Sequence, residues 1–381
     1  RHLDKNIRYQ LPLSSRLGVP EHASTAPLDL TLVVPPDSIP HRPTHLPLCH
    51  FHHVDGSDEQ RRGDWIAVSA LSETLLDAMD RNTMEREWFV DTMLWIPRNC
   101  RHRFLSRVEF TDSLSHLGVK RILVFGDSRG RMLYSDLYNW FRGLNPRYFR
   151  TTPWEEWFGV VCGANDPPNR RLVPPNVSFG GVEIHYVFAH NSGDLGTEVY
   201  RQAVSDISPD VVVFNWGLFD IVHGDGQSQR WSARYNDSYT DDLMFEFLHA
   251  ASSASPNVKL LVNMAGQAHH RQPHYNPSIW DMNRQMHHAH QRWDKERPGW
   301  AVWWGEPFWM TVTRPDKAPD GFHYGPLFKE GNYTVCDCPS TDDQVFENKC
   351  CRRADCGVWS AQLSMTNNLC DMILRHLSNQ F

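Results

Sequence analysis

The sequence predicts an α/β fold in which helices cover both faces of a mostly parallel sheet, forming a three-layer αβα sandwich. Short apolar runs typical of buried strands recur after residue 118, and stretches with helical spacing separate them. Strands that alternate with helices form parallel sheets, because each helix carries the chain back across one face. With 381 residues, 40% of them hydrophobic and 22% charged, the chain can hold one large α/β domain with insertions or two smaller domains.

The first strand and the first helix of this pattern meet at a short polar turn. Residues 119–125 form the apolar run Val-Lys-Arg-Ile-Leu-Val-Phe, which predicts a buried strand. The run leads into Gly126-Asp-Ser128, and residues 131–141 then carry apolar side chains at helical spacing. A serine in such a turn lies beside backbone N–H groups and the positive end of a helix, which is where a nucleophile can work.

The same alternation continues to the end of the chain. Further strands are expected over 182–189, 210–215, 258–263 and 300–304, and helices over 70–84, 196–205, 239–252 and 359–378. In parallel sheets the functional crevice lies beyond the carboxyl ends of the strands. Ser128, Asn215 and Asn263 follow such ends, so we expect them at one edge of the sheet.

The chain divides into an arm and one domain. Residues 1–47 are rich in Pro, His and polar residues and are expected to form an extended N-terminal arm. Residues 48–381 are expected to form a single domain, with 48–118 as a minor flanking subregion and 119–381 as the α/β core. No stretch reaches the roughly 18 to 20 apolar residues of a membrane span. Because the sequence starts with arginine, we interpret it as a trimmed ectodomain or mature form, which leaves a preceding membrane anchor open.

Net charge and composition limit the classes of binding partner that the sequence predicts. The net charge of −7 gives no electrostatic reason to expect nucleic acid or an anionic membrane as a partner. The chain has 15 Trp, 11 Tyr and 19 Phe, and such rings suit sugar binding and core packing equally well.

Nine cysteines favour disulfides over zinc. Those from Cys336 to Cys356 predict a disulfide-stapled insertion near the C-terminus. Zinc is the alternative, but the spacing lacks paired C-x-x-C units, and no metal site is predicted. The odd count leaves one cysteine free or joined to a group outside the chain.

Three sequons begin at Asn176, Asn236 and Asn332. Chance alone gives one or two in a chain of this length. Together with the cysteines they predict glycosylation and the lumen of the secretory pathway.

A nucleophilic serine needs a base, and Asp320-Gly-Phe-His323 offers one. An aspartate three residues before a histidine can orient the imidazole so that its other nitrogen takes the serine proton.

Each motif also has a simpler structural explanation. Gly-Asp-Ser can cap a helix, and the side chain of Asn215 can bind backbone groups of a turn. Arg129 and Arg131 are either solvated helix side chains or candidates to hold an anionic acyl donor or substrate. The histidine-rich segments, 49–53, 269–270 and 287–290, are interpreted as surface or structural rather than metal-binding.

The order of these motifs resembles that of the SGNH hydrolase superfamily. Gly-Asp-Ser comes early, an asparagine follows a middle strand, and Asp-x-x-His precedes the last helix. Within the superfamily the chain resembles the PC-esterase-type group. That group includes the plant trichome-birefringence-like polysaccharide O-acetyltransferases and the luminal domain of the animal sialic-acid O-acetyltransferase.

Motifs upstream of the serine extend the resemblance to residues 48–378. Cys49, Gly63-Asp-Trp65 and Trp95-Ile-Pro-Arg-Asn-Cys100 are similar to the family's Cys, Gly-x-Trp and Trp-x-Pro-x-x-Cys arrangement. The resemblance implies a disulfide between Cys49 and Cys100. After Asn215 the chain has Trp216-Gly-Leu-Phe in place of the Gly-His-Trp usual in the plant group.

The resemblance implies a role for each site residue. Ser128 would be the nucleophile, His323 the base and Asp320 its partner. The oxyanion would be held by the Ser128 N–H, by Asn215 and by a glycine that is either Gly180 or Gly181, with Gly180 preferred. Trp216 would join the two arginines as a candidate contact to donor or substrate.

The implied activity is O-acetyl transfer to a polysaccharide or other glycan in the Golgi lumen or after secretion. No bound cofactor is expected. The acetyl donor would be acetyl-CoA or an acetylated intermediate, delivered by a membrane partner. An acetylesterase with the same triad is the first alternative, and a non-catalytic glycan-binding ectodomain is the second.

Overall fold

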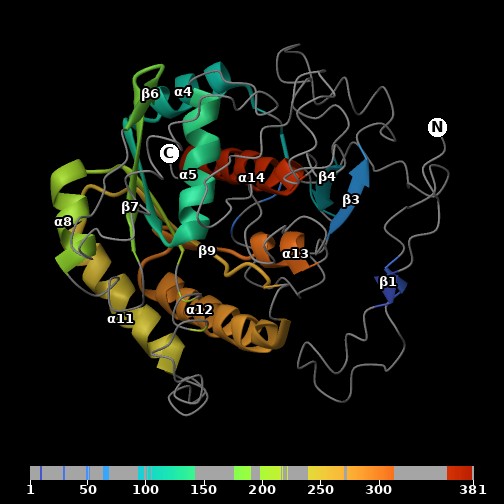
Figure 1. Ribbon diagram of the computed structural model, residues 1–381. Helices are drawn as coiled ribbons and strands as arrows, with labels where there is room; N and C mark the ends of the chain where they lie inside the picture. The colour runs from blue at the N-terminus through green and yellow to red at the C-terminus, as the bar shows by residue number, and fades with distance from the viewer. Residues whose placement is uncertain are drawn as a thin grey trace, which may run out of the picture.

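The computed structural model describes the central sheet and the helices that pack against it. The described residues are 9–10, 29–30, 49, 51, 63–67, 93–97, 100, 102–103, 105–141, 176–189, 198–215, 217, 221, 239–269, 273–312 and 358–379. They form a central sheet with helices on both faces, which confirms the predicted fold class (Figure 1).

The central sheet has six strands in the order β10-β9-β8-β5-β7-β6. Five of them run parallel, and β6 pairs antiparallel with β7. Their bounds are β5 Arg121–Gly126, β6 Val177–Phe179, β7 Val182–Phe188, β8 Val211–Asn215, β9 Leu260–Met264 and β10 Ala301–Trp304. Since β5 lies between β7 and β8, its carboxyl end is at the middle of the sheet edge.

Two hydrophobic cores lie on opposite faces of the sheet. Side chains alternate along β5, so Ile122 and Val124 belong to one core while Leu123 and Phe125 belong to the other. The first core contains α4 (Arg107–His116), α5 (Ser128–Phe141) and α14 (Val358–Ser378). The second contains α8 (Glu198–Ile207), α11 (Tyr239–Ala254) and α12 (Asn276–Glu296). This is the three-layer arrangement expected of strands buried on both faces.

Pieces of the flanking subregion are tied to the core beside α14. β3 (Gly63–Ala67) pairs antiparallel with β4 (Met93–Pro97), and the facing rings of Trp65 and Trp95 lie 5.5 Å apart. The indole of Trp65 donates to the Met310 carbonyl at 3.1 Å, in α13 (Glu306–Val312). The Cys49–Cys100 disulfide is present, which confirms that pairing.

Several elements were not expected from the sequence. These are α4, the long α12, α13, β3, β4, β6, the short 3-10 helix Pro273–Tyr275 and the two-residue pair of β1 (Tyr9–Gln10) and β2 (Asp29–Leu30) in the N-terminal arm. The helix expected over 70–84 lies outside the described residues. Among the described helices, none combines the length and the apolar character needed to span a bilayer.

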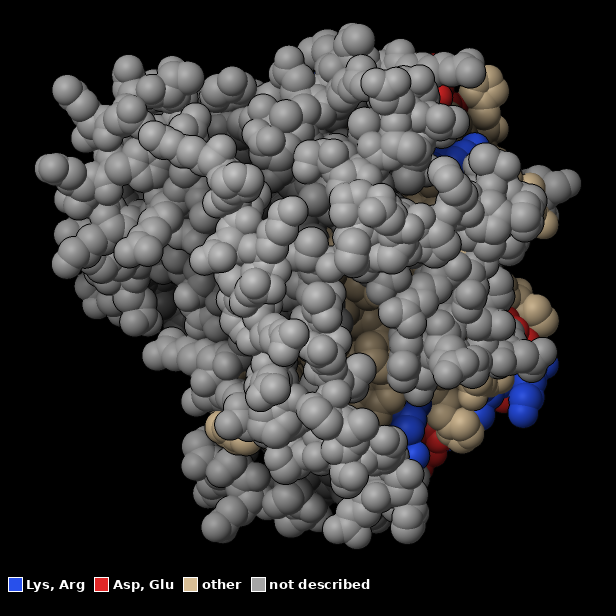
Figure 2. Space-filling view, turned by 90° about the vertical axis from the view of Figure 1, so that its right-hand side faces the viewer, with Lys and Arg blue, Asp and Glu red and all other residues tan. Residues whose placement is uncertain are grey.

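The described surface carries mixed charge. On the face shown in Figure 2, basic and acidic side chains of described residues lie next to one another at the right-hand edge. Interspersed charge of this kind is typical of a solvated surface.

Candidate active site

The turn between β5 and α5 is fixed by hydrogen bonds. Asp127, which is 1% exposed, accepts the backbone N–H of Arg129 on Oδ1 at 2.8 Å and so caps the helix. The hydroxyl of Tyr186 donates to the carbonyls of Gly126 and Asp127 at 2.9 and 3.0 Å. Burial raises the pKa of Tyr186 well above its usual value, which keeps the hydroxyl a donor at neutral pH. Ser128 is the first residue of α5, and hydrogen bonds to the residues on either side of it fix the backbone of this turn.

Asn215 packs beneath this turn from the end of β8. Its side-chain amide nitrogen donates to Asp127 Oδ1 at 2.7 Å, and the residue is 3% exposed. Its amide oxygen lies so close to two glycines that an added Cβ would be 2.0 Å from it at Gly126 and 2.4 Å at Gly130. One N–H of the Asn215 amide thus donates to Asp127. The predicted role of Asn215 in binding the oxyanion would use the second N–H.

Replacing Gly126 with alanine is expected to destabilise the protein by about 1–3 kcal/mol or more, because the new methyl group overlaps the Asn215 side chain. Activity is expected to fall as well, since Asn215 must move away from the nucleophile turn. Urea unfolding and steady-state rates measure the two effects.

Gly181→Ala is a suitable control for Gly126→Ala. At Gly181 a Cβ meets nothing within 4 Å, but φ is +80°, so this variant reports backbone strain without crowding. A Gly126→Ala enzyme as stable and as active as the wild type would contradict this account of the turn.

Arg129 points into the protein. It is 1% exposed, and its guanidinium donates to the carbonyl of Gln267 and, at 3.3 Å, to that of Ala268. These carbonyls belong to the segment that follows β9, so Arg129 joins that segment to the nucleophile turn. The prediction that Arg129 contacts an acyl donor or substrate is corrected accordingly.

Arg131 lies near the same turn and is only partly buried. Its charge acts on the Tyr186 hydroxyl, where it opposes the increase in pKa that burial causes. It remains a candidate to bind an anionic group beside Ser128.

Gly180 lies at the opposite end of the sheet from Ser128. It occupies the tight turn between β6 and β7 with φ of +58°, and its carbonyl accepts from Ser115 at 3.2 Å. Because β7 runs parallel to β5 with Phe188 opposite Gly126, the length of β7 separates Gly180 from the nucleophile turn by about 20 Å. The prediction that Gly180 or its neighbour Gly181 contributes to an oxyanion hole is wrong.

Other predicted site residues lie outside the described residues: Asp320, His323, Trp216, Asn236 and Asn332. For Ser128 the description covers the backbone and not the hydroxyl. Asn176, the first sequon, is exposed immediately before β6. Asn263 lies within β9 rather than at the site, and its amide nitrogen is 3.1 Å from the Nε2 of His290. The geometry of the predicted triad therefore stays a prediction.

A buried acid on α5 was not anticipated. Asp136 is 4% exposed and accepts the Thr366 hydroxyl on Oδ2 at 3.0 Å, across the contact between α5 and α14. Burial raises the pKa of Asp136 to about 8, and the hydrogen bond from Thr366 offsets part of that increase. The carboxyl group is therefore protonated at neutral pH.

The protonated state of Asp136 predicts a pH-dependent stability. The native protein holds a proton that the unfolded chain releases near pH 4, so the free energy of unfolding should fall as pH rises from there to about 8. The limiting slope is ~1.4 kcal/mol per pH unit. Asp136→Asn should remove this slope in urea titrations, whereas Asp112→Asn, at an exposed position on α4, should keep it. An unchanged slope in Asp136→Asn would contradict the assignment.

No known family model matches this chain, and no curated protein sequence matches it. Solved structures show only loose similarity. One is the salicylyl-acyltransferase SsfX3 from a tetracycline biosynthetic pathway, with 12% identity and a TM-score of 0.34 over 64% of this chain. The aligned part spans only about half of that acyltransferase, 53% of its length. Another is a carbohydrate esterase family 3 protein from Talaromyces cellulolyticus, with 12% identity and a TM-score of 0.32, covering 68% of this chain and 99% of that protein. Similarity at this level carries no activity over to this chain, whose αβα architecture is established by its own sheet order and helix layers.

Proposed function

We propose that this chain is an SGNH-type serine acyltransferase that moves acetyl groups onto glycan hydroxyls in the lumen of the secretory pathway. The observation that carries the proposal is the position of Ser128, at the first turn of a 14-residue helix and directly beyond the central strand. Hydrogen bonds from Tyr186 and Asn215 fix the turn on which it lies.

This position suits a nucleophile. The first N–H groups of a helix have no partner within the helix, and the helix dipole places partial positive charge there. An oxyanion that forms on a carbonyl attacked by Ser128 would be stabilised by these groups. The order of Gly-Asp-Ser, strand-end asparagine and Asp-x-x-His supports the assignment of the remaining roles.

The proposed reaction has two steps. The Ser128 hydroxyl attacks the acetyl carbonyl while His323, oriented by Asp320, takes its proton and passes it to the leaving group of the donor. A glycan hydroxyl then attacks the acetyl-serine ester and gives its proton to His323, which passes it to the Ser128 oxygen as the ester bond to Ser128 breaks. Water in place of the glycan gives hydrolysis instead.

Donor and acceptor follow from the same reasoning. The donor is acetyl-CoA or an acetylated intermediate supplied by a membrane protein, and Arg131, which is partly buried in the first turn of α5, is the candidate cation for an anionic donor. The acceptor is a polysaccharide, with Trp216 as a candidate stacking platform. The Cys49–Cys100 disulfide supports an oxidising compartment such as the Golgi lumen.

The test is product analysis by mass spectrometry. The protein is incubated with acetyl-CoA or p-nitrophenyl acetate, with and without an oligosaccharide mixture. Transfer predicts acetylated sugar and a reduced yield of free acetate when sugar is present. Free acetate at the same rate in both reactions would assign the acetylesterase activity instead, and no consumption of either donor would contradict acyl-transfer chemistry at this site.

A further inference from the structure

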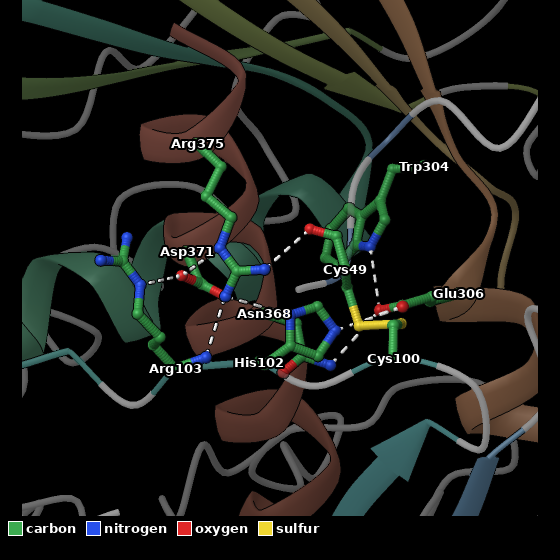
Figure 3. Close-up of a disulfide and its surroundings, with 9 residues drawn as sticks. All are labelled: Cys49, Cys100, His102, Arg103, Trp304, Glu306, Asn368, Asp371 and Arg375. Carbon is green, nitrogen blue, oxygen red and sulfur yellow. Dashed lines mark hydrogen bonds and ion pairs between the residues drawn. A yellow bond between two sulfur atoms is a disulfide. The ribbon is translucent and has the colours of Figure 1, made fainter. Parts of the chain in front are cut away.

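A cluster of metal-ligating side chains surrounds the Cys49–Cys100 disulfide (Figure 3). The cluster, here called the His102 cluster, consists of this disulfide, His102 and Glu306. A sulfur, an imidazole nitrogen and a carboxylate oxygen from Cys49, His102 and Glu306 all lie within 4.8 Å of one another. The imidazole Nε2 is 3.3 Å from Glu306 Oε1, and the two side chains are 3% and 12% exposed. A sulfur, an imidazole and a carboxylate, which are the ligand types of zinc, thus meet in a largely buried site.

A second layer of contacts orients the His102 ring. Its other nitrogen, Nδ1, lies 3.4 Å from Oδ2 of Asp371, a residue of α14 whose side chain is fully buried. The carboxylate–histidine pair leaves Nε2 directed toward the disulfide and Glu306 (Figure 3). Histidines that bind zinc are held in this way, with a carboxylate on the nitrogen that does not bind the metal.

The Glu306 carboxylate is oriented as well. Its Oε2 accepts from the amide of Asn368 at 3.3 Å and from the indole of Trp304 at 3.5 Å. The remaining oxygen, Oε1, faces His102. A carboxylate with one oxygen held by neighbours and the other turned toward an imidazole is arranged as a monodentate metal ligand.

We propose that reduction of the disulfide converts the His102 cluster into a tetrahedral zinc site. Its ligands are both cysteine sulfurs, Nε2 of His102 and Oε1 of Glu306. With metal–ligand bonds of about 2.0–2.3 Å, tetrahedral ligands lie roughly 3.3–3.8 Å apart. The ligand atoms of Cys49, His102 and Glu306 already lie within 4.8 Å of one another, and the two sulfurs start from bonding distance, so movements of about 1–2 Å complete the site once the bond between the sulfurs is broken.

The conversion is balanced. A dithiol, such as a thioredoxin-type protein, gives two electrons to the disulfide and is itself oxidised to a disulfide. Each of the two cysteine thiols loses a proton when zinc binds, because cysteine binds as the thiolate, and His102 binds through a neutral ring nitrogen. Zinc with two thiolates and one carboxylate has a net negative charge, which Arg103 and Arg375 around Asp371 compensate.

The zinc site would replace one cross-link by another. The disulfide and its flanking backbone are already tied to α14, since Arg375 donates to the Cys49 carbonyl at 3.0 Å. Zinc would join the same segments to α13 through Glu306. In a reducing environment, where the disulfide is lost, the zinc ion would then hold together the segments that contain Cys49 and Cys100.

Cobalt titration tests the site directly. Wild-type protein reduced with a phosphine should gain the visible bands of tetrahedral Co²⁺ with a thiolate charge-transfer band, and equimolar Zn²⁺ should abolish them. Alkylation followed by peptide mapping should show Cys49 and Cys100 protected from modification by zinc, which separates them from the other seven cysteines. Unreduced protein should show neither effect at these two positions.

Variants decide which residues bind the metal. His102→Gln and Glu306→Gln should lose the protection, and Asp371→Asn should weaken zinc binding by about 10–100-fold. His116→Gln, at an exposed position on α4, is the matched control and should bind as the wild type does.

If reduction unfolds the protein, the Cys100→Ser variant tests the metal site without a reductant. It leaves Cys49, His102 and Glu306 as three ligands without any reductant, and it should bind Co²⁺ more tightly than the double variant Cys100→Ser/His102→Gln. Equal binding by these two variants, or zinc-independent alkylation of Cys49 and Cys100 in the reduced wild type, would overturn the proposal. Neither readout depends on enzymatic activity.

Discussion

Replacement of Ser128 by alanine is expected to lower the rate of acetyl transfer by at least about 10³-fold. The alanine enzyme has no hydroxyl to form the acyl intermediate, so only binding and oxyanion stabilisation remain. Initial rates with p-nitrophenyl acetate, and covalent labelling with a fluorophosphonate probe, measure the loss. Labelling should disappear completely because the probe bonds to the serine oxygen.

The fold should survive this change. Asp127 caps α5 through the Arg129 N–H and Asn215 binds Asp127, and neither contact uses the serine side chain. The free energy of unfolding should therefore change by less than about 0.5 kcal/mol. Ser205→Ala, at an exposed position on α8, is a matched control and should keep both activity and labelling. A fully active Ser128→Ala enzyme would refute the nucleophile assignment.

The strands of the core were predictable because they are buried on both faces. Continuous Val, Ile and Leu runs mark such strands, and the expected 119–125 and 258–263 correspond to β5 and β9 with shifts of at most two residues at each end. The apolar runs do not predict the order in which these strands lie in the sheet. It depends on contacts between segments far apart in the chain.

The 21-residue α12 carried a signal that the sequence analysis did not use. Its buried apolar residues recur at spacings of three and four, at Ile279, Met282, Met286, Ala289 and Trp293. Its many polar residues obscured this periodicity. Asn283 is one of them, and it is buried because its amide replaces a backbone partner for Gly266, at 2.7 and 2.9 Å.

Half of the candidate site was accessible from the sequence. Placing Ser128 and Asn215 at one edge needed only the rule for carboxyl ends of parallel strands, and the hydrogen bond from Asn215 to Asp127, the residue before Ser128, agrees with it. Gly180 was misplaced because the short antiparallel β6 was not expected. The hairpin it forms with β7 puts this glycine at the amino end of a parallel strand.

The His102 cluster could not be predicted from spacing. Its members come from positions 49, 100, 102 and 306, and neither His102 nor Glu306 belongs to a motif that the sequence analysis identified. Only the packing of α13, α14 and the disulfide brings them together.

The largest effect on stability is expected from Asp371→Ala. The carboxylate is fully buried and accepts from the backbone N–H and Nε of Arg103, each at 2.9 Å, and from both Nε and Nη2 of Arg375. Burial acts to raise the pKa of Asp371, but hydrogen bonds from His102 and the Arg103 backbone and the charges of Arg375 and His102 outweigh it, so the pKa is lowered from its usual value. It is thus ionised at neutral pH.

Alanine at position 371 would leave the Arg375 guanidinium, 5% exposed, without its anion. Removing one partner of a buried ion pair destabilises a protein by about 3–5 kcal/mol, because the other charge stays desolvated. Urea unfolding at pH 7 measures the loss. Arg284→Ala removes a surface pair with Asp281, whose side chains are 64% and 38% exposed, and it should cost less than about 1 kcal/mol. Salt separates the two cases further: high ionic strength should weaken the surface pair and leave the Asp371 contribution nearly unchanged, because screening ions do not reach a buried carboxylate. If both variants lost the same small amount of stability, the prediction that the buried pair of Asp371 and Arg375 stabilises the packing of α14 beside the disulfide would be wrong.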